Sequence, residues 1–124
     1  MATAHVQHVS AVTFAVRDMA RAVAFYRKLG FEVSYGGPAA AFTTVYAGNA
    51  FVNLALDPDY RGGRWGRVIF RVNDARAYHA ALAAAGLGPG EPRDGEWGER
   101  YFHVTDPDGH ELSFAQRLFV RPGT

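Results

Sequence analysis

The stretch that decides the fold is WGERYFHVTDPDGHELSFAQ, residues 97–116. Residues 101–105 alternate between two faces and are rich in side chains that favour strands. The letters DPDG at 106–109 predict a tight turn, because proline presets φ and glycine tolerates a positive φ. Residues 110–115 alternate again. The stretch therefore predicts a closing antiparallel hairpin.

An internal repeat extends this prediction to the whole chain. Strand residues, a capping aspartate and a terminating glycine recur at an offset of 56 positions. The matching pairs are Val12 and Val68, Phe14 and Phe70, Val16 and Val72, Asp18 and Asp74, and Gly30 and Gly86. We therefore predict an α+β fold of two tandem βαβββ modules, residues 1–60 and 61–124, within one compact domain. One helix per module covers one face of a curved mixed sheet, and the opposite face is open as a groove.

The patterns also predict where each element lies. Helices are expected over 19–29 and from a cap at Asn73 or Asp74 to residue 85. Residues 57–63 are the expected linker and 88–95 an expected loop. The strands expected besides the closing hairpin are 10–16, 31–35, 41–47, 50–56 and 67–72.

Composition narrows the class of protein. The 124 residues are 48% hydrophobic and 20% charged, which is typical of a globular protein. We find neither a signal peptide nor a long apolar run, so a cytoplasmic protein without a membrane partner is expected. The absence of cysteine excludes disulfides and thiolate chemistry. A net charge of +1 without a basic stripe argues against a nucleic-acid partner.

The two tryptophans are the first candidates for ligand binding. Trp97 lies in GEWGER and Trp65 in RGGRWGR, and both are polar, glycine-rich loop sequences. Core tryptophans are usually flanked by apolar strand residues, so these two are better suited to stacking on a ligand or a partner. The alternative is that they cover the edge of the core or a dimer interface.

Strand alternation places further polar candidates on the predicted groove face. Arg67 and Arg71 could bind carbonyl or carboxylate oxygens of a ligand, or neutralise Glu111. Tyr101 and His103 share the groove face, although a lone histidine on a strand is more often a packed or surface residue than a catalytic base. Three small polar residues could orient a ligand or bond each other, and they are Thr13, Asn53 and Ser113. His79 and His110 are expected to be solvated. No nucleophile–base pair is apparent, so no catalytic residue is expected.

Three features together resemble a known superfamily: the tandem βαβββ pattern, VRDMARAVAFYRKLGFEV at 16–33 and DPDGHELSF at 106–114. They resemble the vicinal oxygen chelate superfamily, which includes glyoxalase I, extradiol dioxygenases, fosfomycin-resistance enzymes and bleomycin-resistance proteins. The resemblance covers about residues 8–118. It implies a groove in which the enzymes hold a divalent metal through His and Glu. The matching positions here are Ala11, Asn53, Arg67 and Ser113, which are not a divalent-metal set.

The lack of these ligands shifts the resemblance to the drug-binding branch of the superfamily. In that branch a Trp-Gly pair stands nine residues before the turn, as Trp97-Gly98 stands before Asp106, and some members have a tryptophan at the position of Trp65. The resemblance implies sequestration of a planar hydrophobic small molecule, such as an antitumour antibiotic, without a cofactor. A mitomycin-like or quinone-type ligand is favoured over cationic bleomycin, whose binders are acidic.

The resemblance also implies a homodimer, because family members usually complete each groove with a partner and often exchange arms. Two alternatives stay open. One is a metal-dependent glyoxalase- or dioxygenase-type enzyme with a rearranged site that uses His103 and Glu111. The other is a structural or regulatory dimer whose tryptophans are buried in the interface.

Overall fold

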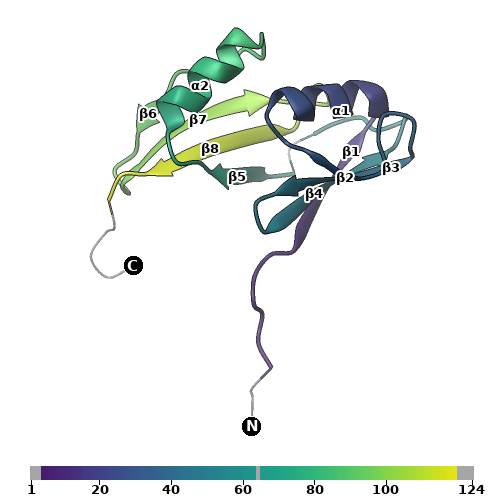
Figure 1. Cartoon of the computed structure of the whole chain (residues 1–124), viewed down its shortest axis with the longest axis horizontal. Helices are drawn as coiled ribbons and strands as arrows, with labels where there is room; N and C mark the ends of the chain where they lie inside the picture. The colour runs from purple at the N-terminus through teal and green to yellow at the C-terminus, as the bar shows by residue number, and fades with distance from the viewer. Residues whose placement is uncertain (1–3, 64, 120–124) are drawn as a thin grey trace.

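The computed structural model describes residues 4–63 and 65–119. Its element order is the unit βαβββ twice (Figure 1). The first unit comprises β1 (Ala11–Val16), α1 (Met19–Lys28), β2 (Val33–Tyr35), β3 (Phe42–Ala47) and β4 (Ala50–Leu56). The second comprises β5 (Arg67–Arg71), α2 (Ala75–Ala84), β6 (Arg93–Asp94), β7 (Glu99–Thr105) and β8 (Glu111–Arg117). The predicted α+β fold of two βαβββ modules is confirmed.

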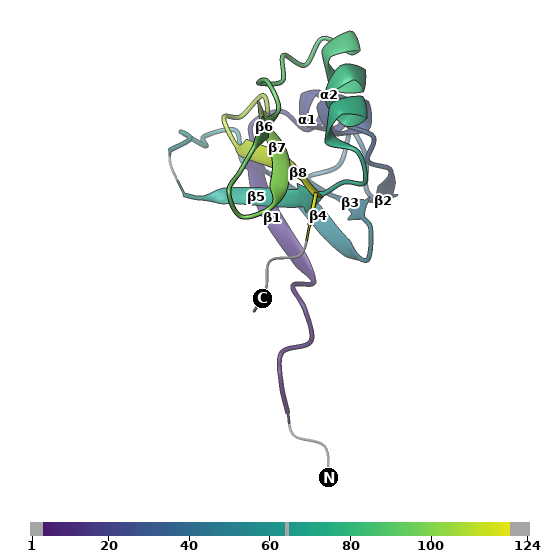
Figure 2. The same ribbon diagram turned by 90° about the vertical axis from the view of Figure 1, so that its left-hand side faces the viewer.

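Each unit forms its own four-stranded mixed sheet. The strand orders are β1-β4-β3-β2 and β5-β8-β7-β6, so the two sheets have the same topology. In each sheet the first strand pairs in parallel with the last, and the other pairs are antiparallel. Figures 1 and 2 show both helices on the same side of the sheets. Within residues 4–63 and 65–119, no helix covers the other face of either sheet, which we call its open face.

The repeat in the sequence has a physical basis at the helix ends. Asp18 and Asp74 are both extended N-cap residues, and their carboxylates accept the N–H groups of Arg21 and Ala77, each at 3.0 Å. Asp74 rather than Asn73 is therefore the second cap. The offset of 56 positions thus repeats the local signals that start a helix.

One hydrophobic core lies between the helices and the sheets. Its largest fully buried side chains include Tyr26, Phe14, Phe102 and Phe114. The two modules share this core, because the rings of Phe31 and Phe70 lie 5.1 Å apart. Burial of these apolar surfaces, at about 25 cal/mol per Å², supplies most of the stabilisation.

The turn at 106–109 also joins the two modules. Asp106 accepts the N–H groups of Asp108 and His110 through Oδ1, at 2.9 Å each. Its Oδ2 accepts the hydroxyl of Tyr26 on α1 at 2.8 Å. Burial, together with the nearby Asp106 carboxylate, raises the pKa of Tyr26 well above its ordinary value, so this phenol remains a donor. The turn residues predicted from local chemistry therefore also hold the second module to the first.

A second carboxylate strengthens the same junction. Asp108 has a fully buried side chain whose Oδ1 lies 3.1 Å from Arg17 Nε and 3.0 Å from Arg21 Nη2. The backbone N–H of Arg17 donates to the same oxygen at 2.9 Å. Two arginines of the first module thus pair with one buried acid of the second.

Several expectations are corrected by the structure. Residues 88–95, expected as a loop, contain β6, whose Arg93 pairs with Tyr101. His110, expected to be solvated, is 3% exposed because the turn folds it against Phe14. His79 is half-buried, with its ring edge against Phe102. The predicted module limits 1–60 and 61–124 include residues 1–3, 64 and 120–124, which lie outside the described residues.

No helix in the described part of the chain has the length and apolar character needed to span a membrane.

Candidate functional site

The open face of the second sheet gathers most of the predicted binding residues. Phe102 and Phe114 of β7 and β8 face α2, since they contact its residues His79 and Tyr78. Alternation therefore turns their neighbours to the open face. Strand register aligns these neighbours in three rows across the sheet, namely Arg93–Tyr101–Ala115–Arg71, His103–Ser113–Ile69 and Thr105–Glu111–Arg67.

Aromatic rings follow one another from Trp97, just before β7, into β7. The ring centroids of Trp97 and Tyr101 lie 5.3 Å apart, and those of Tyr101 and His103 lie 5.4 Å apart. We call Trp97, Tyr101 and His103 the aromatic row. Trp97 is 46% exposed, and its indole N–H donates to Glu99 at 2.8 Å. A Cβ at Gly95 would come within 2.5 Å of the indole, so this glycine permits the ring position. The aromatic row thus has one exposed ring, Trp97, followed by the half-buried rings of Tyr101 and His103.

His103 is the titratable member of the row. Its Nδ1 shares a hydrogen bond of 2.7 Å with the Ser113 hydroxyl. Burial, and then the charge of Arg67, lower the pKa of His103 below its ordinary value, against a smaller opposing effect of Glu111. The imidazole is therefore neutral at pH 7, and it contributes a ring face and a hydrogen-bonding nitrogen.

The lowered pKa of His103 leads to a prediction about stability. The folded state binds fewer protons than the unfolded chain once the pH falls below 6.5, the ordinary histidine value. The stabilisation from neutral His103 is complete above that pH and is lost as the pH falls toward the folded-state pKa. His103→Gln should therefore lose less stability than the wild type between about pH 7 and pH 5. Urea unfolding at each pH measures this difference, and parallel curves would contradict it.

The predicted arginines lie on the opposite side of β8 from the row. Arg67 pairs with Glu111 at 3.0 Å, and both side chains are partly exposed. Arg71 forms no ion pair with another described residue. Between β5 and β7, Ala115 and Ser113 are each 3% exposed. Neighbouring side chains therefore cover these two small residues, with aromatic rings on one side of β8 and arginines on the other.

Two predicted residues lie instead on the first sheet. Asn53 donates to Thr13 at 3.2 Å and accepts from the hydroxyl of Thr44 at 2.8 Å. The predicted alternative that these small polar groups bond each other is therefore observed for Thr13 and Asn53. They lie on a different sheet from the aromatic row.

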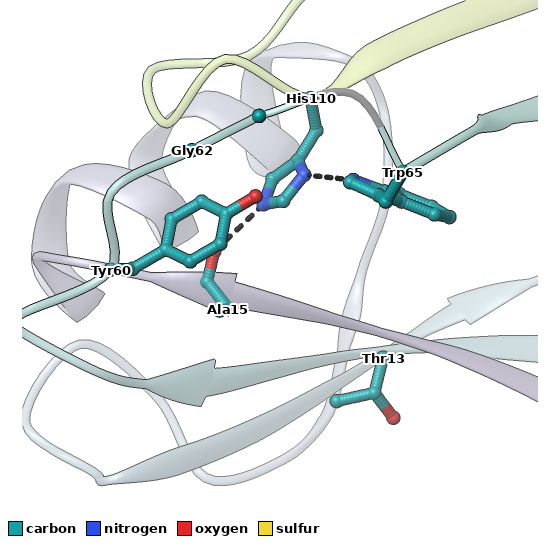
Figure 3. Close-up of a pocket in the computed structure, with 7 residues that line it drawn as sticks. Thr13, Ala15, Tyr60, Gly62, Trp65 and His110 are labelled. Atoms are coloured by element: carbon teal, nitrogen blue, oxygen red, sulfur yellow. Dashed lines mark hydrogen bonds between the residues drawn. The ribbon is translucent and has the colours of Figure 1, made fainter.

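Trp65 lies beside a separate pocket of about 350 Å³. Figure 3 shows the His110 imidazole between Trp65 and Tyr60. The Trp65 indole N–H donates to His110 Nδ1 at 2.8 Å, so His110 Nε2 carries the proton and donates to the Ala15 carbonyl at 2.7 Å. The pocket is lined by Thr13, Ala15, Tyr60, Gly62, Gly63, Trp65 and His110. Trp65 and Trp97 therefore belong to different clusters in one chain.

Sequence reasoning missed several residues of these two places. Ala115 and Ile69 share the open face with the predicted residues, and their positions in the alternating strands could have identified them. Arg93 was not identified because residues 88–95 were expected to form a loop rather than to contain β6. Tyr60 and His110 carried no local signal, because the fold alone brings them beside Trp65.

The residues at the family's metal positions do not fit a divalent ion. Ala11 has no donor, Asn53 is bonded within the first sheet, Arg67 is cationic and Ser113 is bonded to His103. Residues 4–63 and 65–119 contain no group of three or more His, Cys, Asp or Glu placed to hold a metal. The rearranged site also lacks support from geometry, since His103 bonds Ser113 and Glu111 pairs with Arg67.

Comparison with known proteins assigns the family. Residues 5–114 match the model of the Glyoxalase/Bleomycin resistance protein/Dioxygenase superfamily. The chain belongs to this superfamily. Among curated proteins, none matches the sequence.

Solved structures of the superfamily share this fold at low identity. A bleomycin resistance determinant encoded on the transposon Tn5 has 20% identity and a TM-score of 0.78, covering 91% of this chain and all of its own. A bleomycin-binding protein complexed with bleomycin has 21% identity and a TM-score of 0.75, covering 90% and 99%. The lactoylglutathione lyase of Agrobacterium tumefaciens has 17% identity and a TM-score of 0.73, covering 90% and 94%. Identities at this level show the fold alone, and the superfamily includes both binding proteins and enzymes.

Proposed function

We propose that this protein binds and sequesters a planar, largely apolar small molecule on the open face of its second sheet. The observation that carries the proposal is the aromatic row of Trp97, Tyr101 and His103, held at successive ring distances of 5.3 and 5.4 Å. Trp97 is exposed, and Tyr101 and His103 are half-buried beside it. Prearranged rings favour stacking of a planar ligand, because little side-chain entropy is lost on binding. The bleomycin complex of one structural neighbour supports small-molecule binding by this fold.

Sequestration is favoured over chemistry by the state of the polar groups on this face. Arg67 and Glu111 neutralise each other, and Ser113 is bonded to His103. The positions that hold a metal in superfamily enzymes carry no fitting donor set. A mitomycin-like or quinone-type antibiotic is the ligand that we favour, and antibiotic resistance is the role that would follow. A tightly held divalent ion, one per chain, after purification would overturn this reading in favour of an enzyme.

The test is a tryptophan-fluorescence titration with mitomycins, anthraquinones and bleomycin. Trp97 and Trp65 are the only tryptophans, so each single replacement leaves one reporter. We expect saturable quenching in the wild type and in Trp65→Ala, where Trp97 remains. Calorimetry should show that Trp97→Ala binds the ligand at least about tenfold more weakly than the wild type, because one stacking contact contributes about 1–3 kcal/mol.

One result would contradict the proposed function, and another would contradict only the proposed site. No saturable response to any ligand would overturn the binding function. Quenching that survives in Trp97→Ala but disappears in Trp65→Ala would move the site to the Trp65–His110 pocket.

We also propose that the binding unit is a homodimer. Thr13 and Asn53 lie on one sheet and the aromatic row on the other, and β1 and β5 each pair on one side only within the described residues. Large apolar side chains are exposed beside them, including Val9 at 69% and Ile69 at 64%. Light scattering should give twice the chain mass of 13.5 kDa. A monomer at micromolar concentration would contradict this proposal.

A further inference from the structure

The open face of the second sheet has an excess of positive charge beside its aromatic row. Strand register places four arginines on this face, Arg67, Arg71, Arg93 and Arg117, against two glutamates, Glu99 and Glu111. Glu111 is paired with Arg67, and Glu99 accepts the indole N–H of Trp97. Neutral His103 adds no charge. The face therefore repels cations and attracts anions.

Two of these arginines are in line with Tyr101. Arg93 is directly opposite Tyr101 on β6, and Arg71 is in the same row on β5, with Ala115 between. Adjacent strands lie about 4.8 Å apart, so the backbones at Arg71 and Tyr101 are about 10 Å apart. Tyr101 thus has an arginine on each side across the sheet, Arg93 on β6 and Arg71 on β5. A ring stacked there would have a guanidinium within reach at either edge.

Both arginines are available to a ligand. Neither Arg71 nor Arg93 forms an ion pair with another described residue, and both are exposed. By contrast, Arg100 on the helix side of the same sheet is held by Asp94 at 2.7 Å. A planar guanidinium matches a carboxylate through two parallel N–H···O bonds, which a neutral amide cannot reproduce.

We infer that the site selects a planar aromatic ligand that carries a carboxylate, with the ring stacked on the aromatic row and the carboxylate bound by Arg71 or Arg93. This inference rests on the proposed function and specifies its ligand class. Ala115 and Ser113 lie on β8 between the two halves of the site, so no bulky side chain of β8 stands between the aromatic row and Arg71.

The test compares two probes of the same shape, anthraquinone-2-carboxylate and anthraquinone-2-carboxamide. Calorimetry with the wild-type chain should show about tenfold tighter binding of the carboxylate. Replacing both Arg71 and Arg93 with glutamine should remove this preference and leave the affinity for the amide unchanged. The single replacements Arg71→Gln and Arg93→Gln then show which arginine binds the carboxylate. Added salt should weaken binding of the carboxylate more than that of the amide. Arg27→Gln, the same charge change on the exposed surface of α1, is the matched control and should change neither.

The outcomes separate the inference from the function. Equal affinity for both probes, or a preference unaffected by the double replacement, overturns the carboxylate inference while the binding function stands. An equal loss of preference in Arg27→Gln also overturns it, because net charge would then be the cause. Failure of both probes to bind overturns the inference, and the wider drug titration then decides the function separately.

Discussion

Replacing Asp106 with alanine is expected to lower the free energy of unfolding by about 3–5 kcal/mol. Asp106 is 4% exposed and accepts three hydrogen bonds, two from backbone N–H groups and one from the Tyr26 hydroxyl. Alanine would leave these donors buried without an acceptor. Each buried unsatisfied group costs about 1–3 kcal/mol, so the sum approaches the stability of a small domain.

Chemical denaturation monitored by circular dichroism measures this loss. Tyr26→Phe, which removes one of the three bonds, should cost about 1–2 kcal/mol. Asp94→Ala is the control, because Asp94 pairs with Arg100 on the surface and its loss should change stability little. If Asp106→Ala were no worse than Asp94→Ala, the turn would not be the junction between modules that the structure shows.

Replacing Phe14 with alanine in the wild-type chain is expected to lower the free energy of unfolding by about 3–5 kcal/mol. Phe14 is 1% exposed and lies where the modules meet. Its ring is 4.8 Å from that of His110, 5.6 Å from Trp65 and 6.2 Å from Tyr26. Truncation removes buried apolar surface and leaves a cavity beneath the Trp65–His110 pocket.

Denaturation again gives the magnitude, and fluorescence gives the location. In a Trp97→Ala background the remaining emission comes from Trp65, so Phe14→Ala should shift it as the indole loses its neighbour. Phe51→Ala is the matched control, since Phe51 is only partly buried and should cost less. Equal losses in the two variants would show that Phe14 has no special role at the junction.

Much of the fold could be predicted because its signals are local. Asp18 and Asp74 start helices through hydrogen bonds that span three residues. The alternation of Tyr101 and His103 with Phe102 and Val104 determines which side chains share a face, since strand side chains have a period of two. The binding roles of these residues stay predictions that the titrations above test.

The remaining errors concern contacts between distant segments. His110 looks like an exposed turn residue, yet its imidazole bonds Ala15 and Trp65, 95 and 45 positions away in the chain. The pairing of Arg93 with Tyr101 converts part of an expected loop into β6. No rule that considers a few neighbouring residues can detect such pairings.

The sequence by itself determined the repeated βα pattern of the two modules, the first helix cap at Asp18 and the face on which residues of the predicted strands lie, because these depend on periodicity and on short-range hydrogen bonds. Only the tertiary structure decided that the two tryptophans occupy different clusters and that Arg71 lies in line with Tyr101. Arg71 and Tyr101 are on strands that never pair directly, and β8 between them sets their alignment. The charge beside the aromatic row thus arises from sheet order, which depends on the path of the whole second module.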